Sequence, residues 1–196
     1  MTVRTLFVTR LYETELSFDL AALAEASRAI ASEDIAGQRW ARDNAYGGYT
    51  SYASLNDLTR RDSLFDDLRR QLDRHVAAFA TELFLDTKKL KLESLWINIL
   101  KPGAAHSGHI HPASVISGTL YLETPKGASA IRFEDPRLPM MMAAPKRRGD
   151  APETDRTFVY VEPKPGTLLL WESFIRHEVP ANGAKSERMS LSFNYA

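Results

Sequence analysis

Cysteine is absent from the 196 residues of this chain. The absence excludes a disulfide framework, and it excludes the thiolate ligands that hold structural zinc ions and iron–sulfur clusters. Any metal ion bound by this protein must therefore be held by histidine, aspartate or glutamate side chains. Histidine is itself scarce, with five residues in the chain, so the places where histidines gather are informative.

An excess of one charge is also absent, because 25 Lys and Arg residues balance 25 Asp and Glu residues. No overall field attracts the chain to nucleic acid or to an anionic membrane, and we expect neither as a partner. No apolar run approaches the ~18 residues of a membrane-spanning helix. The first residues, "MTVRTLFVTRLYETEL", carry no secretory signal, and we expect a cytoplasmic protein.

The first third of the chain predicts one strand, one helix and one loop. Residues 5–12, "TLFVTRLY", have the composition of a short strand. Residues 17–34, "SFDLAALAEASRAIASED", place apolar side chains at helical spacing. Residues 37–62 are rich in Gly, Tyr, Asn and Ser and have no clean period, so we expect an irregular loop.

A second helix is predicted over residues 63–84, where six apolar residues form one stripe. Ser63 followed by Asp66 resembles a capping box at its start. His75 lies beside the apolar stripe, and we interpret it as a packing or surface histidine because no chemically active residue surrounds it.

From residue 89 onward the pattern changes to short strands and turns, interrupted by a Pro-rich and charged insertion at 136–156. Helices followed by strands predict an α+β, mainly β fold, in which a sandwich or barrel is braced by N-terminal helices. We expect one domain over 1–196, with 1–88 as the bracing part and 89–196 as the β core. The predicted strands are 92–100, 109–112, 114–124, 130–136, 157–163, 167–173 and 188–196.

Three of the five histidines lie in "HSGHIHP", residues 106–112. Side chains two apart on a strand point to the same face, about 6–7 Å apart, so His109 and His111 are able to converge on one metal ion. Imidazoles suit Fe(II), Zn, Cu and Ni. Histidines in turns at the surface are the alternative, and clustering favours the metal site.

Arg188 begins a strictly alternating segment, "RMSLSFNY". Its polar residues share one strand face and its apolar residues share the other. An amphipathic strand with its polar face in water is one interpretation. The other is that Arg188 and Ser190 clamp a carboxylate inside the barrel while the apolar face packs on the helices.

These residues resemble the pattern of Fe(II)/2-oxoglutarate-dependent oxygenases, which is H-x-[D/E], a distal histidine, and R-x-S about ten residues later. The segments "NILKPGAAHSGHIHPASVISGTLYLETP" and "PKPGTLLLWESFIRHEVPANGAKSERMSLSFN" carry the resemblance, in particular to bacterial and phage members without an assigned substrate. The resemblance implies a double-stranded β-helix, or jelly roll. It also implies that Fe(II) is held by His109, His111 and His177.

For the cosubstrate, the resemblance assigns the far carboxylate of 2-oxoglutarate to Arg188 and Ser190. Tyr121 matches a tyrosine that reaches this carboxylate in some relatives, and Asn98 is a weaker candidate for the other end of the cosubstrate. The implied activity is that of a dioxygenase, a hydroxylase that consumes O2 and 2-oxoglutarate. Its substrate, a small molecule or a peptide, is not identified, and homo-oligomerisation is left open.

One departure from the family pattern is that His111 stands where relatives keep a carboxylate. An all-imidazole site leaves the iron with more of its positive charge. His106 is expected to be a turn residue or a partner of the ligands, although it competes with the other two as a ligand. Loops 37–62 and 136–156 are the expected substrate walls.

Three rival functions remain open at this point. "GAAHSGHIH" also matches the start of a cupin motif, but the expected Glu is missing from "PASVIS", and Leu169 stands where the second half of the motif has histidine. A metal-free jelly-roll binding protein is the second rival. A zinc hydrolase is the third, although no glutamate base is suitably spaced near the histidines.

Overall fold

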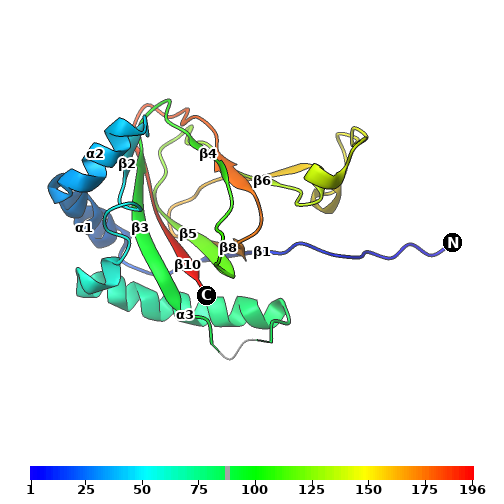
Figure 1. Ribbon diagram of the computed structural model, residues 1–196, viewed down its shortest axis with the longest axis horizontal. Coiled ribbons are helices and arrows are strands. Elements are labelled where there is room, and N and C mark those ends of the chain that lie inside the picture. The colour runs from blue at the N-terminus through cyan, green and yellow to red at the C-terminus, as the bar shows by residue number, and fades with distance from the viewer. Residues whose placement is uncertain (87–88) are drawn as a thin grey trace.

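Two antiparallel sheets form the body of the protein in the computed structural model, which describes residues 1–86 and 89–196 (Figure 1). The larger sheet has the strand order β1-β8-β5-β10-β3-β2 and the smaller one β4-β9-β6-β7. The strands of the larger sheet are, in that order, Leu11–Glu15, Thr167–Glu172, Ile116–Glu123, Arg188–Tyr195, Leu92–Leu100 and Gly48–Thr50. Those of the smaller sheet are His106–His109, His177–Val179, Ile131–Glu134 and Phe158–Val161.

Three α-helices accompany the sheets: α1 (Leu20–Glu33), α2 (Ile35–Asp43) and α3 (Ser63–Glu82). In Figure 1, α3 runs beneath β3 and β10 of the larger sheet, while α1 and α2 lie at one side of it. This arrangement confirms the predicted mainly β architecture braced by N-terminal helices.

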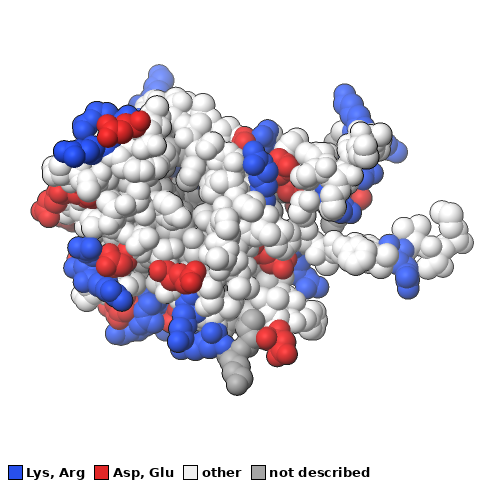
Figure 2. Space-filling model, in the orientation of Figure 1, with Lys and Arg blue, Asp and Glu red and all other residues white. Residues whose placement is uncertain are grey.

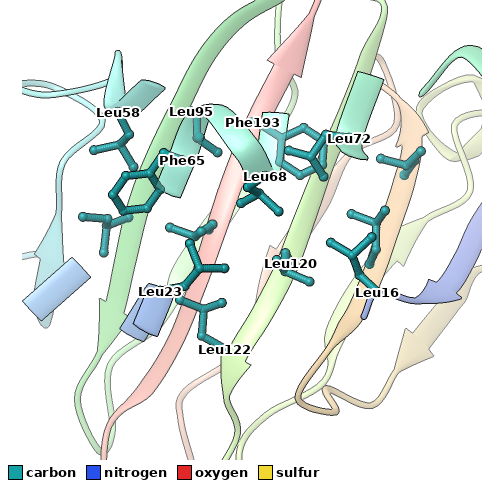
Figure 3. Close-up of a cluster of buried hydrophobic side chains, with 14 of the residues drawn as sticks. Leu16, Leu23, Leu58, Phe65, Leu68, Leu72, Leu95, Leu120, Leu122 and Phe193 are labelled. Atoms are coloured by element: carbon teal, nitrogen blue, oxygen red, sulfur yellow. The ribbon is translucent and has the colours of Figure 1, made fainter. Parts of the chain in front are cut away.

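The main apolar core lies between the helices and one face of the larger sheet (Figure 3). Leu23 of α1, Phe65 of α3 and Phe193 of β10 are all fully buried in it. A smaller apolar cluster lies between the two sheets, where Tyr121 and Trp171 meet side chains of the smaller sheet. The larger sheet is therefore buried on both faces, and the second face is the one that looks into the barrel.

Helix α3 forms where the apolar stripe predicted it, but its first residue is capped differently. The carboxylate of Asp62 accepts a hydrogen bond of 2.8 Å from the backbone N–H of Leu64. The capping box predicted for Ser63 and Asp66 was therefore wrong by one position. The reason is that Asp66 forms ion pairs with Arg69 and Arg70 and does not reach back to the cap.

His75 on α3 has the packing role that the sequence predicted. Its Nδ1 lies 2.8 Å from the hydroxyl of Tyr12 on β1, and no other histidine is near it. Burial lowers the pKa of His75 below its usual value, and the charge of Arg74 lowers it further. The residue ties the helix to the edge strand.

The prediction of an irregular loop at 37–62 was wrong, because α2 occupies its first part and β2 its middle. Asp34 explains the helix, since it ends α1 and caps α2 at the same time. Its buried carboxylate accepts hydrogen bonds from the backbone N–H of Gly37 at 2.9 Å, from the hydroxyl of Tyr49 at 2.9 Å and from Ser54 Oγ at 2.5 Å. The buried residues of this short helix are Gly37 and Ala41, which are too small to form the stripe of large apolar side chains that predicted α3.

The predicted strand at 5–12 was wrong in its position, because β1 begins only at Leu11. Leu11 pairs with Trp171, which lies one residue before the end of β8. Earlier residues run past the end of β8 and have no strand to pair with in the described part of the chain.

The segment 136–156 projects from the body beyond β6 (Figure 1). It contains two short 3-10 helices, Leu138–Met140 and Glu153–Asp155. Figure 2 shows basic side chains gathered toward its end, whereas charges of both signs are intermingled over the rest of this face. Within the described ranges, no helix is both long and apolar enough to cross a membrane.

We expect Leu68→Ala to lower the free energy of unfolding by about 2–5 kcal/mol, because a fully buried leucine leaves a cavity when it is truncated. Leu64→Ala, one turn earlier and only half-buried, is the matched control and is expected to cost about 1 kcal/mol. Urea unfolding followed by circular dichroism measures both. Equal losses in the two variants would contradict the placement of the core.

Candidate metal centre

Three imidazoles meet between the two sheets. His109, His111 and His177 each offer a ring nitrogen, and these nitrogens all lie within 4.8 Å of one another. The ring centroid of His109 is 4.4 Å from that of His177 and 4.9 Å from that of His111. No carboxylate belongs to this group, so a metal ion held here would have three neutral ligands.

The backbone brings the three rings together in two different ways. His109 on β4 pairs directly with His177 on β9, a strand that the sequence did not predict. His111 lies beyond the end of β4, and its backbone N–H donates to the carbonyl oxygen of Ser173 at 3.0 Å. The prediction that His109 and His111 share one continuous strand was therefore wrong, although their side chains still converge.

Main-chain carbonyl groups determine which nitrogen of two of the rings is free. Nδ1 of His109 lies 2.7 Å from the carbonyl oxygen of Ser107, and Nδ1 of His177 lies 2.9 Å from that of Ile175. A carbonyl oxygen only accepts, so each Nδ1 carries the proton. Each Nε2 is then left with a lone pair for a metal ion.

Burial keeps the imidazoles neutral. Together with the smaller effect of a charge on the neighbouring His109, it lowers the pKa of His177 to about 3 and that of His111 to about 4. The pKa of His109 is also lowered, again mainly by burial. Metal ions bind the neutral ring, so these histidines are ready to act as ligands at neutral pH.

His106 is the fourth imidazole and lies outside the group of three. Its ring stacks on that of His109 with centroids 4.5 Å apart, and it meets the edge of Tyr46 at 5.7 Å. Burial lowers its pKa to about 3. The contact supports the predicted role of His106 as a partner that holds His109, and it does not supply a ligand atom close to the other two rings.

Strand β10 is buried on both faces, with the alternation that its sequence predicted. Met189 and Leu191 pack into the main core, whereas Arg188, Ser190 and Ser192 line a cavity that the histidines also line. The interpretation of this polar face as solvent-exposed is therefore excluded. One cavity is lined by Trp96, Asn98, Leu100, His106, His109, His111, Gly118, Thr119, Ile131, Trp171, His177, Val179, Arg188, Ser190 and Ser192.

Arg188 is 3% exposed, and among the described residues no carboxylate pairs with it. Its Nε has no hydrogen-bond partner, and the same is true of the hydroxyl of Tyr121 and of Nε1 of Trp171. The Arg188 guanidinium lies over the ring of Tyr121 at 5.0 Å, and burial raises the pKa of that tyrosine, so its hydroxyl keeps its proton. Buried polar groups are rarely left without partners, and these three are able to donate to the same kind of acceptor.

Trp171 was missed at the level of sequence. It is 2% exposed, and its ring meets that of His177 edge-on at 4.7 Å. The strict apolar run "TLLLW" gave no reason to separate it from ordinary core residues. Only the approach of β9 shows that this tryptophan belongs to the site.

Asn98 and Ser190 were both expected near the cosubstrate, and both line the cavity. The amide of Asn98 is already engaged: its oxygen accepts from Thr50 Oγ1 at 2.9 Å, and its nitrogen donates to Ser192 Oγ at 3.1 Å. Asn98 therefore holds strands together and has less capacity for a ligand than Arg188 has.

Of the two expected substrate walls, the segment 37–62 contacts residues of the site, although among the described residues neither segment lines the cavity itself. From the segment 37–62, Tyr46 contacts His106, and Tyr52 meets Trp96 edge-on at 5.0 Å. Tyr52 is 49% exposed, whereas Trp96 is 3% exposed and its ring lies 5.9 Å from that of His111. Among the described residues, none that lines the cavity comes from 136–156.

Comparison with known families gives one match. A family model described as "Putative 2OG-Fe(II) oxygenase" covers residues 94–194, just over half of the chain. The matched range includes the three histidines, Arg188 and Ser190. No curated protein matches the sequence.

Solved structures show the same fold. A prolyl-4-hydroxylase from Pseudomonas putida has a TM-score of 0.63 at 20% identity, covering 95% of this chain and 92% of that one. The α-ketoglutarate-dependent epimerase SnoN from nogalamycin biosynthesis has 0.65 at 14%, covering 95% and 76%. The collagen prolyl hydroxylase vCPH of Paramecium bursaria chlorella virus-1 has 0.57 at 11%, covering 94% of each. At these identities the likeness concerns the fold, and it confirms the predicted jelly roll.

The lowered pKa values predict how Zn(II) binding, a diamagnetic probe of the centre, depends on pH. Protons compete for a ring nitrogen only below the pKa of the folded state, which is about 3 for His177 and about 4 for His111. We therefore expect His177 and His111 to contribute almost no proton release at pH ~6, so calorimetry in two buffers of different ionisation enthalpy should show the release of at most about one proton. Three histidines with ordinary pKa values would release about two protons there, and that result would contradict the burial of the rings.

Proposed function

The chain belongs to the 2OG-Fe(II) oxygenase family, and on that premise we propose that His109, His111 and His177 are the ligands of its Fe(II). The observation that carries the proposal is their convergence beside Arg188, a buried cation without a carboxylate partner. The family assignment makes the protein a dioxygenase that uses Fe(II) and 2-oxoglutarate. The substrate is the part that the family leaves open.

The residues present fit a divalent transition metal. Three neutral imidazoles suit Fe(II), and two of them already direct a lone pair at Nε2 through hydrogen bonds from Nδ1 to main-chain carbonyl groups. Three protein ligands leave coordination positions free for other molecules.

The residues beside the histidines fit a dicarboxylate. Burying an unpaired guanidinium is costly, and a bound carboxylate offsets that cost by accepting hydrogen bonds from it. Arg188 Nε, Tyr121 OH and Trp171 Nε1 are donors without partners, and an anion with oxygen acceptors satisfies such a set. We infer that Arg188 binds the far carboxylate of 2-oxoglutarate, with Ser190 and Tyr121 beside it.

When bound together, Fe(II), 2-oxoglutarate and O2 supply the oxidising power that hydroxylates a C–H bond, with succinate and CO2 as products. The side chains of this protein position the cosubstrate and exclude bulk water from the site. Trp171 and Phe133 pack on His177 and keep bulk water from that side of the site. Arg188 and Tyr121 orient the cosubstrate because both are fixed by burial before it binds.

The wall formed by Tyr52 and Trp96 indicates what part of a substrate reaches the site. Trp96 lies beside His111 and is buried, and the aromatic surface that the pair exposes is that of Tyr52, on which no ion pair is found among the described residues. Such a surface favours an uncharged ring or aliphatic group. Two of the matched structures are prolyl hydroxylases, and a prolyl ring is one group of this kind.

We also infer that residues 1–196 form one domain. The main core takes side chains from α1, from α3 and from the central strands alike. The main core is thus shared by 1–88 and 89–196, and among the described residues only the smaller cluster between the sheets takes its buried side chains from 89–196 alone.

His177→Ala is expected to weaken Fe(II) binding by more than ~100-fold. Losing a residue that only holds a ligand in place costs ~10–100-fold, and losing a ligand should cost more. The physical reason is the removal of one of three ligands. Anaerobic metal analysis after dialysis measures it, with one iron per chain expected for the native protein. His75→Ala is the matched control, because His75 bonds to Tyr12 and lies outside the group of three histidines, and it should keep its iron. Full iron occupancy in the His177 variant would refute the ligand assignment.

Arg188→Ala is expected to weaken 2-oxoglutarate binding about 100-fold or more, because the cosubstrate loses its charged partner inside the barrel. Iron is expected to stay, since Arg188 is not a ligand. Anaerobic calorimetry with Mn(II) or Fe(II) measures both quantities. Arg70→Ala, on the exposed side of α3, is the control and should leave cosubstrate binding unchanged. If the native protein binds no 2-oxoglutarate, the assignment of Arg188 fails.

A further inference from the structure

One of the three histidines differs from the others in what faces its Nδ1. His109 and His177 meet main-chain carbonyl groups, whereas Nδ1 of His111 meets the side-chain amide nitrogen of Asn194 at 3.4 Å. Asn194 is 6% exposed and lies on β10, on the same face as Arg188. Among the described residues it is the one side chain that forms a hydrogen bond with any member of the group of three.

Asn194 is linked in turn to two buried serines. Its Oδ1 accepts from Ser117 Oγ at 2.8 Å, and Ser117 Oγ lies 2.8 Å from Ser173 Oγ. Both serines are 1% exposed, so water does not compete for these bonds. The same Ser173 accepts the backbone N–H of His111 through its carbonyl oxygen. The chain Ser173–Ser117–Asn194 therefore reaches His111 from two sides.

The orientation of the amide decides which nitrogen of His111 is protonated. An amide N–H that donates to Nδ1 leaves the proton of the neutral ring on Nε2, and that nitrogen then has no lone pair for a metal ion. A half-turn of the amide places its oxygen against Nδ1. The ring then donates from Nδ1, and Nε2 becomes a ligand, as in the other two histidines.

The serines make the second orientation feasible. After a half-turn, the amide nitrogen needs an acceptor, and Ser117 Oγ lies at the right place. The hydroxyl of Ser117 then turns its own proton toward Ser173 Oγ. Hydroxyl groups both donate and accept, so the direction of this chain reverses without any movement of the backbone.

We propose that Asn194 is the positioning residue that sets the tautomer of His111, and that metal binding turns its amide by half a turn. The inference rests on the proposed ligand set. It assigns to a neutral side chain the task that main-chain carbonyls perform for the other two ligands. It also concerns the ring that stands where the family has a carboxylate, so the metal affinity of this protein depends on β10 as well as on β4 and β9.

Three variants separate this role from a merely structural one. Asn194→Ala removes the partner, Asn194→Asp keeps an acceptor for Nδ1–H, and Ser117→Ala removes the acceptor of the turned amide. Ser192→Ala is the matched control, since it lies two residues earlier on the same face and bonds to Asn98 and Thr119 but to no histidine. Zn(II) titration by calorimetry gives the affinity, and nitrogen-15 ring spectra of metal-free and Zn(II)-loaded protein give the tautomer of each histidine.

For the native protein we expect His111 to carry its proton on Nε2 without metal and on Nδ1 with Zn(II). Asn194→Ala should bind Zn(II) about 10–100-fold more weakly, and Ser117→Ala should lose less. Asn194→Asp should restore the affinity and show Nδ1–H in both states. The resonances of His75 should not move, since that histidine lies outside the site.

The proposal is overturned if Asn194→Ala binds Zn(II) within twofold of the native protein, or if His111 keeps its proton on Nε2 when Zn(II) is bound. His111→Ala separates this failure from that of the proposed function. If that variant binds Zn(II) as tightly as the native protein, the ligand set is wrong. If it loses Zn(II) while Asn194→Ala does not, only the role of Asn194 is wrong.

Discussion

Strand β10 holds a buried guanidinium on one face and the centre of the main core on the other. Phe193 and Leu191 pack against the helices, and this packing prevents the strand from rotating its polar face into water. Arg188 is thereby kept inside the barrel, although removing its positive charge from water costs free energy. A strand without this packing would turn the charge toward water. The rest of the site depends on this constraint, because the histidines line the same cavity as the buried charge of Arg188.

The three imidazoles are held by different means, and the difference has a chemical consequence. The rings of His109 and His177 are fixed by carbonyl groups of their own backbone, which no substitution removes. The ring of His111 depends on Asn194, a side chain on another sheet strand. If these three histidines are the ligands, as proposed, they bring no negative charge to the metal ion, and the cosubstrate would be the group that supplies it. Metal binding and cosubstrate binding are therefore expected to support one another through β10.

Much of the fold was predictable because β10 alternates strictly, because other strands are short apolar runs between turn residues, and because the longest helix has one clear stripe. Strand β3 was predicted to its exact bounds, and α3 to within two residues. The errors fall where local pattern does not decide the structure. Helix α2 begins at the cap formed by Asp34, whose carboxylate also accepts a hydrogen bond from Tyr49. No apolar repeat connects these two residues, so the sequence pattern did not indicate the contact. The N-terminal strand is shorter than predicted because β8 ends and leaves its first residues unpaired.

The sequence by itself determined the chemistry that is available here. The absence of cysteine left histidine, aspartate and glutamate as the possible metal ligands, and the cluster of histidines favoured an imidazole site, because both depend only on side-chain type and spacing. The resemblance of the R-x-S segment to a known family implied the carboxylate clamp. Only the tertiary structure decided which groups meet. The pairing of β4 with β9 selects His109 and leaves His106 stacked behind it, and the approach of β9 brings Trp171 into the site. Contacts between strands distant in sequence arise from sheet pairing, which no local pattern specifies.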